Sequence, residues 1–420
     1  MEIFNKTYKN GLRLILEKNE SSVIATNILF NVGSQNETKE QEGYSHFIEH
    51  LMFKSSKNYT TEEIMDKIAF YGADFNAYTS RTVTRYVFKC LKENFEPCFE
   101  IYSDMLINPM YNKEEVDKER EVVIEEMKKC ADEPVQVLYA KVMDNYFEGS
   151  SYAHDELGTE QIISNVTIDQ IKEYKENFYK PENCIISIAG NIDFDVLEKI
   201  VDKYFASLFN YEAKSYSINF KEYFPKITKK YDIVERDDNQ ANVCVHIKSV
   251  NLSNNLKYVA DLYTSILGNS QNSRLYKTIR EKLGLVYTIY AFNDMGAEAG
   301  EIFIIFGTRP KNVKLAISEI KKIINVLATD GITEEELTRT KNCKKSNIAF
   351  NSESNSEVAE LNGTFIHYYN KHITTNERIQ KYDDVTVKQI NEFAKSVANE
   401  KNYNIVAVGK NIKLDDLKQF

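Results

Sequence analysis

The chain has 420 residues, 42% of them hydrophobic and 28% charged, and its formal net charge is −10. This length predicts two domains, and the composition is typical of a globular protein with sizeable buried cores. The acidic balance argues against nucleic-acid and anionic-membrane partners, and no apolar run approaches the roughly 18–20 residues of a membrane span.

The N-terminus and the cysteines bear on the cellular compartment. The chain begins with MEIFNKTYKNGLRLILEKNE, which is interrupted by charges and lacks the apolar stretch of a targeting signal. The six cysteines are far apart and form no CxxC pair, which fits reduced thiols better than a disulfide framework. We therefore expect a cytoplasmic protein.

A predicted helix near the N-terminus carries two histidines four residues apart, in GYSHFIEHLMFKSSKNY (43–59). On a helix, His46 and His50 share one face and could bind one metal ion, while Glu49 is close enough to contact a water on that ion. This HxxEH pattern is the inverzincin motif, the reverse of HExxH. Two ordinary histidines on a buried helix give the same five letters, so the pattern needs support from elsewhere in the chain.

Strands are predicted on both sides of this helix. Runs of apolar residues indicate strands at LRLILEKN (12–19) and VTRYVFKCL (83–91). The segment FNAYTS (75–80) is predicted to be a strand with a polar edge. From its residues alone, it is compatible with an ordinary sheet edge.

An acidic helix is predicted at EEVDKEREVVIEEMKKCADE (114–133). At about 100° per residue, Glu119 and Glu126 fall on the side of the apolar stripe around Val123, so both carboxylates point inward. Buried carboxylates are costly unless something compensates them, and a divalent cation would do so. A zinc enzyme with two histidine ligands needs a third protein ligand, for which we predict Glu126. If the edge of the apolar stripe is exposed to water, or if a salt bridge compensates the carboxylates, their inward position needs no metal ion.

Two segments of the chain resemble each other at a constant spacing. The first is VTIDQIKEYKENFYKPENCIISIAG (166–190), and it aligns without a gap with VTVKQINEFAKSVANEKNYNIVAVG (385–409). Each is predicted to be an N-capped helix, a turn and a short strand ending in glycine. The shift of 219 residues is close to half the chain length, which favours internal duplication over chance similarity.

A polar segment without helical periodicity separates the two copies. We predict a zinc-binding domain over 1–210, an extended linker over 211–228, and a homologous domain without a metal site over 229–420. Short strands mixed with long amphipathic helices predict an α+β fold of two α/β sandwich domains, each a mainly antiparallel sheet covered by helices.

The second half carries a further pair of candidate residues, Arg280 and Tyr287, in SRLYKTIREKLGLVY (273–287). Taken alone, this segment indicates the end of an amphipathic helix with a surface arginine and a core tyrosine. Where a second HxxEH would be expected, the chain has YVADLYTSILG (258–268), so we predict one zinc ion per chain.

An HxxEH motif followed 76 residues later by a glutamate within EREVVIEE resembles the pitrilysin/insulinase family of zinc peptidases. The resemblance is closest to the family's short, two-domain, bacterial processing-peptidase-like branch, which is also built from a duplicated domain. It covers nearly the whole chain and includes NGLRLILE at the start, DFNAYTSRTVTRYVFK at 74–89, HDELGTEQIISNVT at 154–167, YKPENCIISIAGNI at 179–192 and SRLYKTIREKLGLVYTIYA at 273–291.

The resemblance implies a role for each residue of the metal motif. In the family, two histidines and the distal glutamate bind zinc, and they correspond here to His46, His50 and Glu126. Glu49 corresponds to the catalytic base. Glu119 corresponds to a supporting carboxylate, which could hydrogen-bond a ligand histidine and fix its tautomer.

The resemblance also implies how substrate is bound. Arg280 and Tyr287 match a pair that binds substrate and stabilises the developing oxyanion. Asn76 and Ala77 match a strand whose backbone pairs with an extended peptide.

Short members of the family form two-chain clamshells in which one chain's zinc motif faces its partner's Arg/Tyr pair. Because this chain carries both motifs, we expect a homodimer, although some members divide the motifs between two different chains. The expected substrates are peptides or unfolded segments small enough to enter a closed chamber, and no nucleic-acid or membrane partner is expected.

Two alternatives remain open. One is a noncatalytic structural or partner subunit of a heterodimeric peptidase, although such members usually lose HxxEH residues. The other is a non-haem iron oxygenase, because two histidines and one carboxylate also form that site. An oxygenase does not require a glutamate poised between its histidines.

Overall fold

A computed structural model describes residues 2–206 and 230–420, and they form two compact units. The first unit contains residues 2–128, 154–206 and 349–373. The second unit contains residues 129–153, 230–348 and 374–420. Within the described ranges, no helix combines the length and apolarity needed to cross a membrane.

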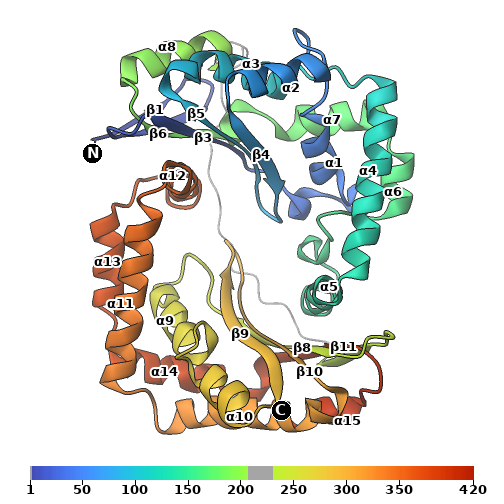
Figure 1. Ribbon diagram of the computed structural model, residues 1–420, viewed down its shortest axis with the longest axis vertical. Coiled ribbons are helices and arrows are strands. Elements are labelled where there is room, and N and C mark those ends of the chain that lie inside the picture. Colours follow the sequence, from blue (N-terminus) through green and yellow to red (C-terminus); the bar gives the residue numbers. More distant parts are fainter. Residues whose placement is uncertain (1, 207–229) are drawn as a thin grey trace. The chain divides into compact units, whose positions relative to one another are not determined.

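The first unit is built on a sheet of order β1-β2-β6-β3-β5-β4 (Figure 1). All neighbouring strands are antiparallel except β2 and β6. The strands are β1 (Glu2–Thr7), β2 (Arg13–Lys18), β3 (Val23–Phe30), β4 (Asp74–Thr79), β5 (Thr84–Leu91) and β6 (Cys184–Gly190).

Helices cover one face of this sheet and enclose the main core of the unit, which includes Phe47, Tyr86 and Phe99. The helices are α1 (Tyr44–Leu51), α2 (Thr61–Phe70), α3 (Phe95–Ile107), α4 (Lys113–Asp132), α6 (Glu160–Asn165), α7 (Ile168–Phe178) and α8 (Phe194–Tyr204).

The second unit is built on a sheet of order β7-β11-β8-β10-β9, with β7 and β11 parallel and the other neighbours antiparallel. The strands are β7 (Tyr231–Val234), β8 (Ala241–Ser249), β9 (Val286–Met295), β10 (Gly300–Thr308) and β11 (Tyr403–Val408). The helices are α9 (Lys257–Gly268), the π-helix η7 (Tyr276–Lys282), α10 (Val313–Thr329), α11 (Glu334–Asn351), α13 (Thr375–Asp383), α14 (Val387–Val397) and α15 (Leu414–Leu417). The predicted α+β fold of two mainly antiparallel sheets covered by helices is confirmed.

The two sheets correspond strand by strand. The order β2-β6-β3-β5-β4 matches β7-β11-β8-β10-β9, and the one parallel pair falls at the same place in each. Tyr403 opens β11 and stands 219 residues after Cys184, which opens β6. The helices before these strands both begin with a threonine capping box, at Thr167 and Thr386. This agreement is what the predicted duplication requires.

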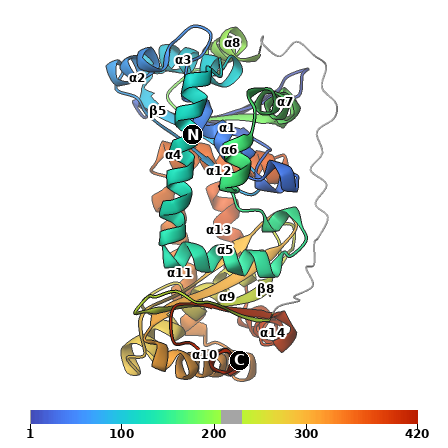
Figure 2. The same cartoon turned by 90° about the vertical axis from the view of Figure 1, so that its right-hand side faces the viewer.

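Two helices at equivalent places in the repeat each pack on the sheet formed by the other half of the chain. α5 (Pro134–Tyr146) packs on β8 and β11 (Figure 2), and α12 (Asn355–Tyr369) packs on β3 and β6. The contiguous ranges predicted from the sequence, 1–210 and 229–420, therefore differ from the compact units in these segments. The apolar face of an amphipathic helix can pack on either of two similar sheets, so the sequence could not show which sheet α5 and α12 cover. The predicted linker, 211–228, lies outside the described residues.

Candidate metal centre

Gly43 is the N-cap residue of α1 and has a left-handed backbone conformation that favours glycine, with φ of +92°. A Cβ atom at this position would lie 2.5 Å from the carbonyl oxygen of Leu157, so a side chain is excluded on two grounds. The Glu37 carboxylate accepts hydrogen bonds from the N–H groups of Gly43 at 2.8 Å and Ser45 at 2.7 Å. Glu37 therefore satisfies backbone donors at the start of the helix.

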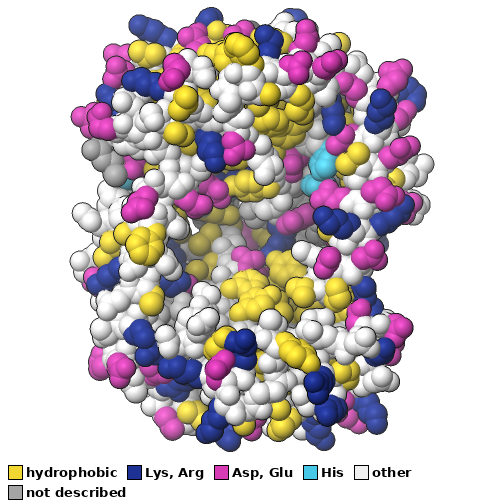
Figure 3. All heavy atoms as spheres, viewed as in Figure 1, with side chains coloured by type: hydrophobic (Ala, Val, Ile, Leu, Met, Phe, Trp, Pro, Cys, Tyr) yellow, Lys and Arg dark blue, Asp and Glu magenta, His cyan; other side chains and the backbone are white. Residues whose placement is uncertain are grey.

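The two histidines of α1 lie side by side at the edge of the core. Phe47, Ile48 and Leu51 are buried, and His46 is nearly so, with its side chain 11% exposed. The ring of His50, whose centroid lies 4.6 Å from that of His46, is more accessible, at 21%. In the space-filling view, histidine atoms reach the surface of the first unit beside acidic side chains (Figure 3). The centre is thus open to an ion or a ligand from solvent.

α4 brings Glu126 to these histidines, because Val116 and Val123 anchor its inner face in the core. Glu126 Oε2 lies 3.7 Å from His46 Nε2 and 3.4 Å from His50 Nε2. In the described part of the chain, this is the one group of three or more histidine, cysteine or acidic residues whose ligand atoms all lie within 4.8 Å of one another. Donors about 2.0–2.1 Å from a tetrahedral zinc ion lie about 3.3 Å apart, so the residues fit zinc.

A second carboxylate from α4 holds His50. Glu119 Oε1 lies 2.8 Å from His50 Nδ1, and Glu119 Oε2 lies 2.5 Å from Lys54 Nζ. Burial opposes ionisation of Glu119, but the hydrogen bonds from His50 and Lys54 outweigh it and lower the pKa of Glu119. Ionised Glu119 accepts a hydrogen bond from the Nδ1–H of His50, so the Nε2 atom, on the side of Glu126, carries the lone pair.

Glu49 is buried beside the histidines and is held by the sheet. Its Oε2 accepts a hydrogen bond from the Thr79 hydroxyl at 2.8 Å, at the end of β4. Burial raises the pKa of Glu49, and the Thr79 hydrogen bond and the charge of His50 oppose this rise only in part. A carboxyl group with a raised pKa is a better proton acceptor once it is ionised.

His46 differs from His50 in its surroundings. Burial, and then the charge of His50, lower the pKa of His46 to about 3. The neutral ring is the form that binds metals. Its Nδ1 atom is buried and has no hydrogen-bond partner among the described residues, so the orientation of His46 depends on packing.

Two family models match the chain in tandem. The model described as Insulinase (Peptidase family M16) matches residues 13–160, which contain the whole metal cluster. The model described as Peptidase M16 inactive domain matches residues 165–343. The chain belongs to peptidase family M16. The pitrilysin/insulinase resemblance predicted from the motifs is confirmed.

Relatives of this M16 family member match it over nearly their whole length. It is 29% identical to the uncharacterized zinc protease YmxG of Bacillus subtilis, over 94% of this chain and 95% of that protein. It is 28% identical to an uncharacterized zinc protease of Rickettsia bellii, over 93% of each chain. A protease of Helicobacter pylori has the same fold, with a TM-score of 0.89, 24% identity and coverage of 97% of this chain and 99% of that chain.

In this M16 family member, Asn76 and Ala77 lie on the edge strand β4, which pairs with β5 alone among the described strands. The Asn76 side chain accepts a hydrogen bond from the Ala77 N–H at 2.9 Å, and the Asn76 carbonyl accepts one from Tyr102 at 3.0 Å. An added peptide strand would compete with Asn76 for the Ala77 N–H. Pairing with substrate at this edge stays a prediction.

Arg280 and Tyr287 both belong to the second unit. Arg280 lies on η7, donates from Nε to the Tyr287 carbonyl oxygen at 3.1 Å and lies 4.7 Å from the Tyr276 ring. Single-turn or short π-helical segments occur frequently at functional sites. Arg280 also pairs through Nη1 with Glu281 at 3.2 Å, and its side chain is 40% exposed.

Tyr287 is 52% exposed, so its interpretation as a core tyrosine is wrong. The reason is a shift of register on β9, where Gly307 pairs with Thr288 but Thr308 pairs with Val286. Tyr287 is the extra residue at this irregularity, and such a bulge turns a side chain away from its regular direction.

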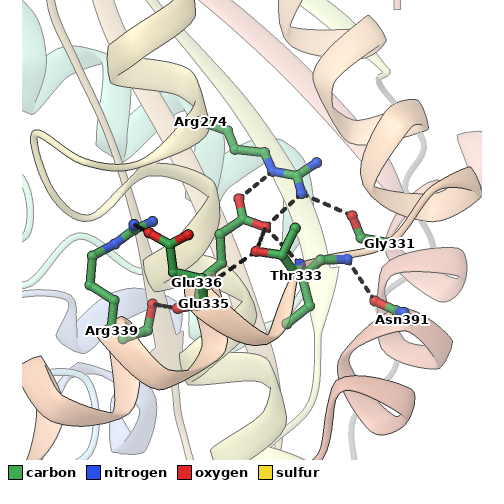
Figure 4. Close-up of polar contacts among 9 residues, drawn as sticks. Arg274, Gly331, Thr333, Glu335, Glu336, Arg339 and Asn391 are labelled. Carbon is green, nitrogen blue, oxygen red and sulfur yellow. Dashed lines mark hydrogen bonds and ion pairs between the residues drawn. The ribbon is translucent and has the colours of Figure 1, made fainter.

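A partly buried ion pair anchors the segment that precedes η7 (Figure 4). Arg274 donates from Nε and Nη2 to the two carboxylate oxygens of Glu336, at 2.8 Å each, and from Nη2 to the Gly331 carbonyl at 2.9 Å. The hydrogen bonds from Arg274 lower the pKa of Glu336 to about 2. Glu336 also accepts from the Thr333 N–H, so the pair joins this segment to the start of α11.

Four residues at these sites were not predicted from the sequence: Glu37, Lys54, Thr79 and Arg309, whose Nε donates to the Tyr287 hydroxyl at 3.1 Å. Lys54 stands four residues after His50, a spacing that gave a weak signal. The other three come from loops or strand ends whose positions depend on tertiary packing. The structure brings together His46, Glu49, His50, Glu119 and Glu126, and it places Arg280 and Tyr287 in the other compact unit.

Proposed function

We propose that the chain is a zinc-dependent endopeptidase that cleaves peptides or unfolded segments. Membership of family M16 supports a peptidase. The observation that carries the proposal is the convergence of His46, His50 and Glu126 with Glu49 beside them.

His46, His50 and Glu126 would hold one zinc ion per chain. When bound, zinc supplies Lewis-acid polarisation and lowers the pKa of a bound water from about 15.7 to about 7. Glu119 keeps His50 in the tautomer that can bind metal, and its ion pair with Lys54 holds the carboxylate in place.

Glu49 acts as the general base in this proposal. It takes a proton from the water that attacks the peptide carbonyl and passes it to the leaving amine. The Thr79 hydroxyl fixes one carboxylate oxygen, so the other remains for the water.

The remaining motif residues bind the substrate. Asn76 and Ala77 pair with an extended peptide at the β4 edge, and Arg280 and Tyr287 contact the peptide and the developing oxyanion. The chain works in the cytoplasm as a homodimer around a closed chamber, with each site completed by the partner's Arg280 and Tyr287. This assembly rests on the resemblance to short family members.

The proposal is tested by measuring bound zinc and peptide hydrolysis for wild type and Glu49→Gln. Loss of the general base lowers turnover by about two to four orders of magnitude while zinc stays near one ion per chain. Unchanged turnover at full zinc occupancy would contradict the role of Glu49, and loss of zinc would make Glu49 a ligand.

Sharing of sites between chains is tested by mixing Glu49→Gln and Arg280→Ala chains. Each homodimer is inactive, whereas mixed dimers regain part of the activity because one of their sites is intact. No recovery, despite demonstrated subunit exchange, excludes sites completed in trans.

A noncatalytic partner subunit is the second candidate, because residues 165–343 match a model described as an inactive domain. The metal cluster lies before this range, and all of its residues are present. Hydrolysis of a quenched peptide by the purified chain alone favours the peptidase. Anaerobic hydrolysis without a 2-oxoacid also excludes an iron oxygenase.

A further inference from the structure

Tyr287 lines a pocket of about 720 Å³ at one end of the second sheet. The pocket lies where β8 begins and where β10 and β11 end, since these ends meet in the strand register. Its polar lining consists of Asn239, Gln240, Tyr287, Arg309, Lys311 and Asn411.

The lining has two cations and no carboxylate. In the described ranges, neither Arg309 nor Lys311 forms an ion pair with an acidic side chain, although the chain as a whole carries a net charge of −10. The remaining polar groups are carboxamides and a phenol, which add hydrogen-bond donors without negative charge. The pocket therefore favours an anion.

The contact between Arg309 and Tyr287 fixes the hydrogen-bonding role of the Tyr287 hydroxyl. Arg309 Nε donates to the Tyr287 hydroxyl oxygen at 3.1 Å. A guanidinium has donors only, so the phenol oxygen accepts, and its own O–H remains to donate to a ligand. The terminal nitrogens of Arg309 present the planar fork that matches a carboxylate.

We propose that this pocket is a carboxylate-binding subsite, in which Arg309 and Lys311 bind an acidic group of the peptide substrate beside the Tyr287 hydroxyl. The carboxylate comes either from the peptide C-terminus or from an aspartate or glutamate side chain. The subsite rests on the proposed peptidase function and adds a preference for acidic peptides to it.

The test measures binding of labelled peptides to the zinc-loaded Glu49→Gln chain by fluorescence anisotropy, so that cleavage does not interfere. One pair of peptides differs only in a C-terminal carboxylate or amide, and a second pair differs only in an internal aspartate or asparagine. Each pair is measured also after adding Arg309→Gln or Lys311→Gln. The control is Lys388→Gln, whose side chain is 85% exposed on α14.

We expect one pair to show about tenfold tighter binding of the acidic member, because a charge-assisted bidentate contact is lost in the neutral one. The pair that responds identifies the source of the carboxylate. Arg309→Gln abolishes the difference, Lys311→Gln reduces it, raised salt weakens it, and Lys388→Gln leaves it unchanged. Circular dichroism confirms that the variants fold.

Equal binding within both pairs, or a difference that survives both pocket substitutions, overturns the subsite. Failure of the subsite and failure of the proposed function are distinguishable. Peptide cleavage by wild type without discrimination between acidic and neutral peptides overturns the subsite alone. Discrimination that depends on Arg309 in a chain without hydrolytic activity overturns the peptidase and leaves the subsite standing.

Discussion

His50 Nδ1 lies 2.8 Å from Glu119 Oε1, while His50 Nε2 lies 3.4 Å from Glu126 Oε2. One ring thus has a carboxylate at each nitrogen, and the two carboxylates come from one helix, two turns apart. Because the pKa of Glu119 is lowered, it remains an acceptor, and His50 presents its basic nitrogen toward Glu126. The two glutamates therefore have different roles: Glu119 positions His50, and Glu126 is a candidate metal ligand.

Glu119→Ala is expected to weaken zinc binding about 10- to 100-fold, because His50 loses the partner that fixes its tautomer. Glu119→Gln retains an acceptor and is expected to show a smaller loss. The affinities are measured by competition with a chromogenic chelator. Equal affinity in wild type and Glu119→Ala would show that Glu119 does not position His50.

Thr79→Val is expected to move the acidic limb of the pH–rate profile to higher pH. The lost hydrogen bond favours ionised Glu49, so its removal raises the pKa of the base, which must be ionised to act. At the pH optimum, we expect roughly a fivefold loss of turnover, equivalent to about 1 kcal/mol. The variant keeps its zinc, and an acidic limb at the wild-type position contradicts the role of Thr79.

Gly43→Ala is expected to destabilise the first unit by about 2–3 kcal/mol and to lower its zinc content, because a Cβ meets the Leu157 carbonyl. Gly72→Ala is the matched control. Gly72 also has a positive φ, +60°, but nothing lies within 4 Å of its added Cβ. Urea unfolding and zinc content are measured for both variants, and similar losses in the two would refute the clash.

Glu336→Gln is expected to lower the free energy of unfolding at pH 7 by about 2 kcal/mol. This is less than the loss of one partner costs in a fully buried ion pair, because the pair is partly exposed to solvent. The folded pKa of Glu336, about 2, lies below its ordinary value of 4.5. The pair therefore stabilises fully above pH 4.5, and this stability is lost as pH falls through 2.

Urea unfolding of wild type and Glu336→Gln is compared between pH 7 and pH 2.5, and the difference should shrink below pH 4.5. Glu335→Gln is the control, because its side chain is 88% exposed and lies 3.7 Å from Arg339 (Figure 4). A difference independent of pH would mean that the charge of Glu336 does not matter.

The metal cluster could be predicted because helical periodicity fixes the inward face of each helix, while the HxxEH motif and the family resemblance linked the two helices. Spacings of four and seven residues put His46 with His50 and Glu119 with Glu126, and the buried Val123 shows which side of α4 faces inward. Likewise, the repeat predicted matching sheets, since a constant shift between segments implies equivalent elements.

Other features depend on tertiary contacts that no local pattern encodes. The hydrogen bond from Thr79 to Glu49 joins a strand end to a helix, and α5 and α12 each pack on the sheet of the other half of the chain. The exposed position of Tyr287 arises from a register shift against β10, whereas apolar periodicity alone placed this residue in the core.

The most direct measurement is anomalous diffraction at the zinc edge from crystals of zinc-loaded protein. The account predicts one strong peak per chain, about 2.0–2.2 Å from His46 Nε2, His50 Nε2 and a Glu126 oxygen. A peak elsewhere, or these three side chains apart with zinc present, would contradict it.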